Sequence, residues 1–224
     1  MVSLRQGYKG HASAFPEEDD VAVIAVLLAG GLARRMGGGD KAQVRLAGRT
    51  LLDHAIARVA PQVDALVLNA NGPPERFAAY GLAVIADPLP DFPGPLAGVL
   101  AGLRYAQAVH PDVAYVVSVP TDTPFLPHDL VARLLAGAPL AVACSAGRTH
   151  PVVGLWPVAL ADALEAALLA GERKIDRWTA QYGVTEIPFE CDPVDAFFNV
   201  NTPEELAEAE RLVADYPKLL VASV

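Results

Sequence analysis

The stretch "AVIAVLLAGGLARRMGGGDKA", residues 22 to 42, decides the fold of this chain. Val23 to Leu28 form a continuous apolar run, which is typical of a strand buried on both faces of a parallel sheet. Five glycines, two arginines, an aspartate and a lysine follow within a short distance. Glycine lets backbone N–H groups approach phosphate oxygens without a Cβ in the way. The stretch therefore predicts a strand that ends in a phosphate-binding loop.

Two better-known glycine loops fit this stretch poorly. A P-loop needs Gly-Lys-Ser/Thr, but here Lys41 lies between Asp40 and Ala42. The residues at 37–42 match a relaxed dinucleotide fingerprint, yet the second strand is followed by Asn69-Ala70-Asn71 rather than by an acid that would bind a ribose. The remaining alternative to a phosphate site is a solvated loop whose glycines only make turns.

Short β-rich runs alternate with helical patterns along the rest of the chain. This alternation predicts an α/β fold with a mostly parallel central sheet and helices on both faces. The predicted strands are residues 23–28, 65–68, 83–86, 114–119, 140–144, 151–155 and 184–189. Helices are predicted after the capping signals at Thr50 and Thr202, and over 98–109, 127–136 and 158–170. We expect residues 1–20 to be a flexible extension, 21–215 one domain and 216–224 a tail.

Composition excludes several classes of protein. The formal charge is −9, which argues against a general nucleic-acid binder, although residues 31–50 carry five basic side chains against one acid. Cys144 and Cys191 form no Cys-x-x-Cys pair, which predicts two reduced, partly buried thiols. The apolar run at 21–29 follows four acids and is too short to cross a bilayer. We therefore expect a cytoplasmic protein that binds no membrane.

The glycine-rich stretch and several later blocks of the sequence resemble a known family. Leu28-Ala29-Gly30-Gly31, followed by Arg35 and by Asp40-Lys41, looks like the signature of the molybdenum cofactor guanylyltransferases. Later blocks match that family in the same order, from about residue 23 to 212: "NANGPPERFAAYGLAVIADPLPDFPGPLAGVLAGL", "VPTDTPFLP", "HPVVGLW" and "AFFNVNTPEEL". The resemblance implies a single-domain Rossmann-like nucleotidyltransferase fold of the glycosyltransferase A type, with the nucleotide in the N-terminal half and the pterin cofactor on the C-terminal side.

The resemblance also implies a reaction and its residues. The enzyme would transfer GMP from GTP to the terminal phosphate of the molybdenum-molybdopterin cofactor in a Mg²⁺-dependent step. Arg35, Lys41 and Asp122 would be catalytic, with Lys41 on the phosphates and Asp122 as the Mg²⁺ ligand. The nucleotide-binding residues would be Leu28, Ala29, Gly30, Gly31, Lys41, Asn69, Asp87 and Asp122. Local sequence alone also allows Asn69 and Asp122 to be turn residues and Asp87 to be a cap before Pro88.

The residues that would bind the second substrate, the pterin cofactor, are indicated by weaker sequence signals than those of the nucleotide site. Residues in the half that resembles the pterin-binding side are Arg148, His150, Arg173, Lys174, Asn199 and Asn201. Arginine suits a phosphate next to a fused heterocycle, whereas His150 alone is also typical of a hydrogen-bonded structural histidine. The rival functions are cytidylyl transfer to the same cofactor or to a sugar or alcohol phosphate, and a nucleotide- or cofactor-binding module without chemistry. Apo-molybdoenzymes or cofactor chaperones are hypothetical delivery partners.

Overall fold

The computed structural model of the protein describes residues 21–30, 40–89 and 94–220. Gly31 and Arg35 of the predicted phosphate loop lie outside these residues, as does the extension predicted at 1–20. No helix in the described part of the chain is long and apolar enough to cross a membrane.

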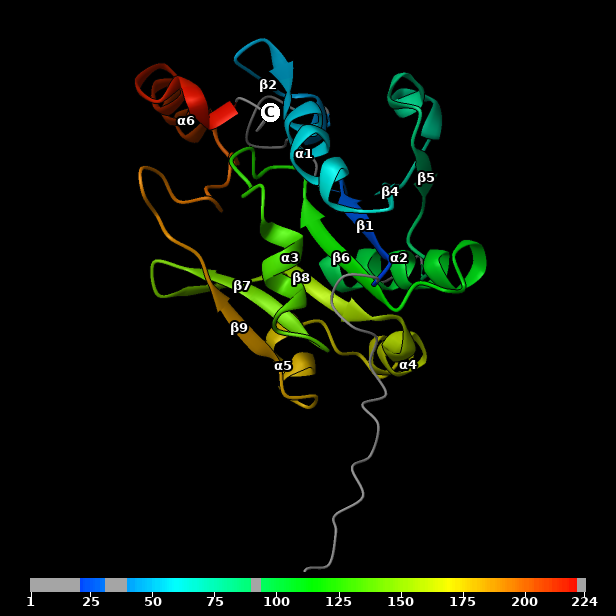
Figure 1. Ribbon diagram of the computed structural model, residues 1–224. Helices are drawn as coiled ribbons and strands as arrows, with labels where there is room; N and C mark the ends of the chain where they lie inside the picture. Colours follow the sequence, from blue (N-terminus) through cyan, green and yellow to red (C-terminus); the bar gives the residue numbers. More distant parts are fainter. Residues whose placement is uncertain (1–20, 31–39, 90–93, 221–224) are drawn as a thin grey trace, which may run out of the picture.

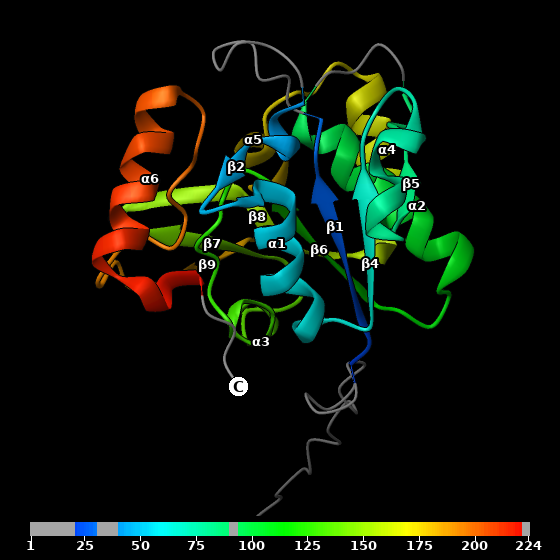
Figure 2. The same ribbon diagram turned by 90° about the horizontal axis from the view of Figure 1, so that it is seen from above.

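One seven-stranded sheet organises the molecule (Figures 1 and 2), in the strand order β5-β4-β1-β6-β8-β7-β9. Every pair of neighbours is parallel except the two that involve β8, so the prediction of a mostly parallel sheet is confirmed. Each of the seven predicted strands is present, with ends displaced by a few residues. They are β1 (Val23–Leu28), β4 (Ala65–Asn69), β5 (Ala83–Ile85), β6 (Tyr115–Pro120), β7 (Ala141–Ser145), β8 (Arg148–Pro157) and β9 (Thr185–Pro188).

Helices cover both faces of this sheet, as predicted. One apolar cluster joins the sheet to α1 (Leu51–Val59) and α3 (Leu130–Leu135). A second cluster, on the opposite face, joins it to α2 (Pro95–Val109), α4 (Ala161–Leu169) and α5 (Ile175–Thr179). Short 3-10 turns connect these elements: η3 (Lys41–Gln43), η4 (Ala60–Gln62), η5 (Pro74–Tyr80), η6 (Val158–Leu160) and η7 (Pro217–Leu220).

The two helices that were predicted from capping signals begin with the expected reciprocal hydrogen bonds. Thr50 accepts a hydrogen bond from the backbone N–H of Asp53, whose carboxylate accepts one in return at the start of α1. Thr202 and Glu205 make the same reciprocal pair at the start of α6 (Pro203–Asp215). Each of these reciprocal pairs, called a capping box, satisfies backbone donors that a helix terminus would leave unpaired.

A hairpin that the sequence analysis missed packs beside α6, and Figure 2 shows it between α6 and α1. Its strands, β2 (Arg45–Leu46) and β3 (Arg49–Thr50), are too short to show an alternating pattern. The third apolar cluster lies there, and Leu219 and Leu220, in the segment predicted as a tail, pack against it. The cysteine prediction holds for Cys144, which is half-buried, but is wrong for Cys191, which is exposed.

The parallel register aligns the ends of four strands at one edge of the sheet. Leu28 pairs with Asn69 on one side and with Pro120 on the other, and Asn69 pairs with Ile85. The residues that follow these ends are therefore neighbours across β5, β4, β1 and β6. Open α/β sheets bind their ligands at this carboxyl edge.

Candidate active site

A cavity of about 420 Å³ opens at this carboxyl edge. Its volume lies within the range of small-molecule sites. The residues that line it come from all four parallel strand ends, from the start of α2 and, in the case of Val152, from β8: Leu28, Gly30, Asn69, Asn71, Asp87, Gly94, Pro95, Pro120, Asp122 and Val152. Five of the predicted nucleotide-binding residues thus share one cavity.

The end of β1 contributes backbone as well as side chains to the cavity. Leu28 lines it, and its carbonyl accepts a hydrogen bond from the backbone N–H of Thr121. Ala29 is buried and donates its N–H to the carbonyl of Asn69 over 2.9 Å, which leaves Gly30 exposed at the rim. The loop after Gly30, with Gly31 and Arg35, lies outside the described residues, so their predicted contacts stay predictions.

Three polar side chains from distant segments meet beside this cavity. The ammonium of Lys41 contacts Oδ2 of Asp122 and Oδ1 of Asn201. The side chains of Lys41 and Asp122 are 12% and 18% exposed, so the pair is largely shielded from water. A cation and a carboxylate in such a place interact more strongly than an exposed pair. The geometry brings together two predicted catalytic residues and one predicted on the pterin side.

Local structure fixes each member of this group. Asp40 caps η3 by accepting the backbone N–H of Ala42, which sets the position of Lys41. Asp122 follows β6, and its carbonyl accepts the N–H of Val200 over 2.9 Å. The backbone N–H of Asn201 donates to Oε2 of Glu205, the capping residue of α6. The capping box of a helix thus also orients a site residue.

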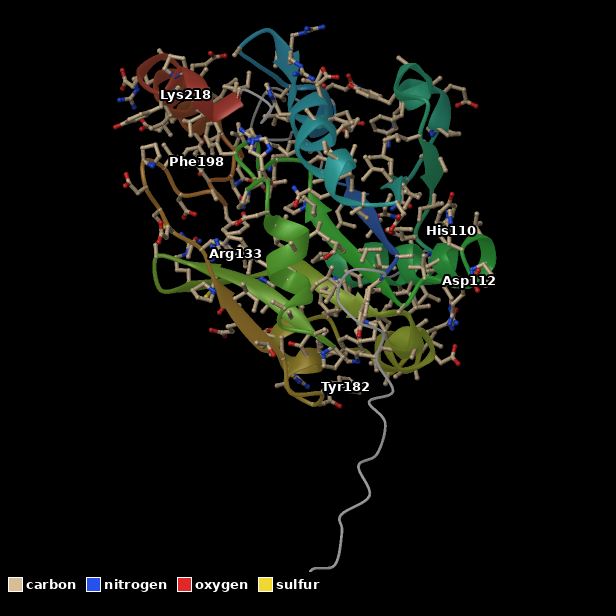
Figure 3. All side chains as sticks on the ribbon, in the orientation of Figure 1. His110, Asp112, Arg133, Tyr182, Phe198 and Lys218 are labelled. Carbon is tan, nitrogen blue, oxygen red and sulfur yellow. The ribbon has the colours of Figure 1, made fainter. Side chains whose placement is uncertain are left out.

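Asn199 lies on the same segment as Asn201 but is exposed. Thr123, which is fully buried, is 3.5 Å from its Oδ1 and 3.4 Å from Oδ1 of Asp122. Phe198, labelled in Figure 3, lies on this segment between β9 and α6 and packs against Phe125 in a tilted arrangement, with ring centroids 6.2 Å apart. Aromatic packing therefore holds the segment that carries both asparagines against the residues after β6.

Polar side chains at the ends of β4 and β5 form a second group in the cavity. Asn69 is buried and donates from Nδ2 to Oδ1 of Asp87 over 2.9 Å. Asn71 donates to the other oxygen, Oδ2, over 2.7 Å, and accepts the backbone N–H of Asp87 over 2.9 Å. Asp87 is therefore held by two amides, one at each carboxylate oxygen.

Helix α2 approaches this group so closely that its packing requires glycine. A Cβ added at Gly98 would lie 2.4 Å from Oδ1 of Asn69 and 2.7 Å from Cδ2 of Leu28. Both distances are far below contact distance, so the missing side chain makes room for Asn69. The helix begins at Pro95, after Gly94, whose φ of 134° is a conformation that favours glycine.

His150 belongs to a hydrogen-bonded cluster between β7, β8 and the segment after β9. Its Nε2 lies 2.7 Å from Oγ of Ser145, and that hydroxyl donates to Oδ1 of Asp195 over 2.8 Å. Its ring packs against Phe197 in a tilted arrangement, with 4.7 Å between centroids. Burial lowers the pKa of His150, while the charge of Asp195 acts in the opposite direction. Since the serine hydroxyl is directed at the carboxylate, this is a structural relay rather than an activated nucleophile.

The remaining residues predicted on the pterin side lie apart from the cavity lining. Arg148 is exposed at the start of β8, paired in register with Ser145. Arg173 donates to the carbonyl of Leu168, and the backbone N–H of Lys174 donates to Oε1 of Glu172. These contacts close the end of α4 and lead into α5.

Sequence reasoning missed two side chains that the structure places at the site. Asn71 stands two residues after Asn69, and this repeat was the available signal, because both follow a strand end. Arg76 gave no signal in the sequence. It donates from Nη2 to the carbonyl of Asn71, and its Nη1 lies 3.3 Å from Oδ2 of Asp40.

A second hollow, of about 500 Å³, is lined by Pro193 and residues 215–219. Its lining is almost entirely apolar, and it does not bring together polar groups from several strand ends. We therefore place the candidate active site at the carboxyl edge of the sheet.

Comparisons with known proteins show the family to which the chain is similar. Residues 25–186 match the family model described as a MobA-like NTP transferase domain. The chain is 57% identical over 203 residues to a molybdenum cofactor guanylyltransferase of Rhodopseudomonas palustris, covering 88% of this chain and 97% of the relative. It is 57% identical over 199 residues to one of Bradyrhizobium, covering 86% and 94%. The crystal structure of molybdopterin-guanine dinucleotide biosynthesis protein A from Archaeoglobus fulgidus has a TM-score of 0.70 at 26% identity, covering 86% of this chain and 99% of that one.

Proposed function

Because the chain belongs to the family of MobA-like NTP transferase domains, we propose that it transfers GMP from GTP to the terminal phosphate of the molybdenum-molybdopterin cofactor. The products are molybdopterin guanine dinucleotide and pyrophosphate. The chain is a nucleotidyltransferase enzyme, so the proposal concerns which nucleotide and which acceptor it uses. The observation that carries it is the contact of Lys41 with Asp122 and Asn201, beside the cavity that Asp87 and Asn69 line.

The width of the cavity suits a nucleoside triphosphate. Asp87 follows β5 and Asp122 follows β6, and two strands lie between them in the sheet. Neighbouring strands are roughly 4.8 Å apart, so these positions are separated by about 14 Å along the edge. We assign the base to the Asp87 and Asn69 end, and the phosphates to the Lys41 end. Gly30 at the rim would let the chain approach the phosphates closely.

The base end has acceptors that suit guanine. Guanine presents two adjacent donors, N1–H and the N2 amino group, on its Watson–Crick edge, whereas cytosine presents one donor, its N4 amino group, next to the acceptors N3 and O2. An ionised carboxylate only accepts hydrogen bonds. Asp87 therefore favours guanine over cytosine, because cytosine can donate to only one carboxylate oxygen and sets the N3 lone pair against the other.

The residues at the phosphate end fit Mg²⁺. The described residues contain no group of three or more His, Cys, Asp or Glu side chains that could form an all-protein metal site. Mg²⁺ instead prefers one or two carboxylates together with substrate phosphates and water. The Lys41 ammonium already occupies a point where oxygens of Asp122 and Asn201 converge, so this place attracts cations. Asp122 would hold the ion, which when bound neutralises negative charge on the phosphates.

The reaction requires positioning more than proton transfer. An oxygen of the acceptor phosphate attacks the α-phosphorus of GTP, the bond from that phosphorus to the bridging β-phosphate oxygen breaks, and pyrophosphate leaves with the electron pair. The acceptor is already an anion and needs no general base. Among the residues that line the cavity in the described structure there is no histidine, consistent with this chemistry. Lys41 neutralises the charge that develops on the departing pyrophosphate.

The test is pyrophosphate release from GTP, CTP, ATP and UTP in turn, with Mg²⁺, with and without the molybdenum cofactor. Release from GTP that depends on the cofactor is the expected result. Pyrophosphate release from CTP would show that the reaction is cytidylyl transfer instead. Release from GTP with another phosphorylated acceptor would show that the acceptor is not the pterin cofactor. Delivery to apo-molybdoenzymes or through a cofactor chaperone in the cytoplasm remains part of the proposal, and a pulldown with apo-molybdoenzymes tests it.

A further inference from the structure

Asn71 clamps the carboxylate at the base end of the cavity. It contacts Asp87 twice, because its Oδ1 accepts the backbone N–H over 2.9 Å and its Nδ2 donates to Oδ2 over 2.7 Å. Asn69 donates to the opposite oxygen, Oδ1. The second torsion of an aspartate is soft, with a broad distribution, so a carboxylate is oriented by its hydrogen bonds rather than by its rotamer.

The clamp leaves the carboxylate able to accept two further hydrogen bonds. An ionised carboxylate has about four acceptor positions, two on each oxygen. The amides of Asn69 and Asn71 each take one, on different oxygens. One position therefore stays available on each oxygen, which matches a ligand that presents two adjacent donors.

Asn71 is itself held in place by Arg76. One guanidinium nitrogen of Arg76 donates to the carbonyl of Asn71, and the other lies 3.3 Å from Oδ2 of Asp40, a buried oxygen without a hydrogen bond. The guanidinium also packs on the ring of Phe77, with its carbon 4.7 Å from the centroid. The loop after β4 is thus joined to the cap of η3, on which Lys41 lies.

We propose that Asn71 is a positioning residue for nucleobase selection, which fixes the Asp87 carboxylate so that both oxygens face the N1–H and N2 amino donors of guanine. This inference rests on the proposed guanine nucleotide. Without Asn71, one carboxylate oxygen and the Asp87 backbone N–H lose their partners, and the carboxylate can turn away from the base. The phosphate end of the site does not depend on this contact.

The sharpest probe is the pair GTP and ITP, which differ by the N2 amino group alone. In Asn71→Ala, the loss of oriented hydrogen bonds to a charged group weakens GTP binding by about tenfold to a hundredfold. ITP binding falls by less, so the preference for GTP over ITP shrinks. The value of kcat at saturating GTP stays near that of the natural protein, because the interaction is equal in the ground state and in the transition state.

Calorimetry gives the dissociation constants for GTP and ITP and therefore the preference between them. Pyrophosphate release gives KM and kcat. Glu75→Ala, at an exposed position in η5, is the matched control and leaves the binding of both nucleotides unchanged. Asn71→Asp retains an acceptor for the Asp87 N–H, but it removes the donor to the Asp87 carboxylate and adds a like charge beside it. It should therefore also lower the preference for GTP over ITP. This second variant provides the test if Asn71→Ala does not fold.

An unchanged ratio of GTP to ITP affinity in a folded Asn71 variant overturns the proposal. A fall in kcat without a change in that ratio also overturns it, since it would indicate a disturbed phosphate end. If the natural protein binds GTP no better than ITP or CTP, guanine selection by Asp87 fails, and the role of Asn71 fails with it.

Discussion

The ammonium of Lys41 contacts the carboxylate of Asp122 across 81 positions of the chain. The contact joins the first residue of the 3-10 turn η3 to the residues after a central strand, and the segment just before α6 adds Asn201 to it. The group of Lys41, Asp122 and Asn201 therefore exists only when three separate segments are folded together. Its arrangement also decides which substitutions test the mechanism.

Replacing Asp122 by alanine removes the proposed Mg²⁺ ligand while Lys41 keeps its contact with Asn201. We expect turnover to fall by about a hundredfold or more, by analogy with the loss of one charge-stabilising group, and the fold to be retained. Pyrophosphate release at saturating Mg²⁺ measures turnover, and circular dichroism shows whether the fold is retained. Asp162→Ala, an exposed acid paired with Arg104, is the control. Normal turnover in Asp122→Ala would remove this residue from the mechanism.

The glycine at position 98 gives a test of how Asn69 is positioned. In Gly98→Ala the new methyl group collides with Oδ1 of Asn69, 2.4 Å away, and displaces the side chain that holds Asp87. We expect GTP affinity to fall by about tenfold, with a stability loss of about 1–3 kcal/mol from overpacking that is partly offset by the better helix propensity of alanine.

Gly102→Ala is the matched control, on the same helix. Its Cβ would lie 2.8 Å from Cγ1 of Val26, inside the core rather than at the cavity. It carries a similar stability cost but keeps the GTP affinity of the natural protein. Calorimetric titration with GTP compares the two, and equal losses of affinity would show that the effect is general and does not act through Asn69.

Ser145 joins His150 to Asp195 and so anchors the start of the segment that reaches Asn201. Ser145→Ala removes the partner of His150 Nε2 and one of the two hydrogen bonds at Oδ1 of Asp195, which keeps the backbone N–H of Phe197. We expect it to lower the free energy of unfolding by about 1–3 kcal/mol. Thr149→Ala, at an exposed position of the adjacent strand, is expected to change it by less than about 0.5 kcal/mol. Urea unfolding separates these values, and equal stabilities would contradict the anchoring role.

Burial makes the stability depend on pH through two histidines. It lowers the pKa of His54, whose Nε2 contacts the carbonyl of Leu46, below the ordinary value of 6.5, and lowers that of His150. As pH falls below 6.5, the unfolded chain therefore binds protons that the folded chain does not, and stability decreases until the folded pKa is reached. Each histidine contributes at most about 1.4 kcal/mol per pH unit.

The variant His54→Gln tests this dependence. Glutamine retains an N–H donor but has no charge to gain, so the decrease in unfolding free energy between pH 7.5 and pH 5.5 should be smaller than in the natural protein. Urea unfolding at both pH values measures it. Identical decreases in the two proteins would show that His54 does not titrate differently on folding.

Much of the architecture could be predicted from local patterns. The apolar run of β1 and the alternation of strands with helices indicated the parallel sheet, and the signals at Thr50 and Thr202 indicated two helix starts that the structure confirms. These features depend on neighbours in sequence, which a pattern can report. The two-residue strands of the β2–β3 hairpin carry no period and were missed.

The sequence by itself determined which strands end in polar residues, because Asn69, Asp87 and Asp122 each follow a predicted strand. Only the tertiary structure decided their partners. The parallel register sets the order of the strand ends, Gly98 makes room for Asn69, and the loop after β4 brings Asn71 onto Asp87. Hydrogen bonds and charge contacts act over a few ångströms in space, and sequence separation does not measure that distance.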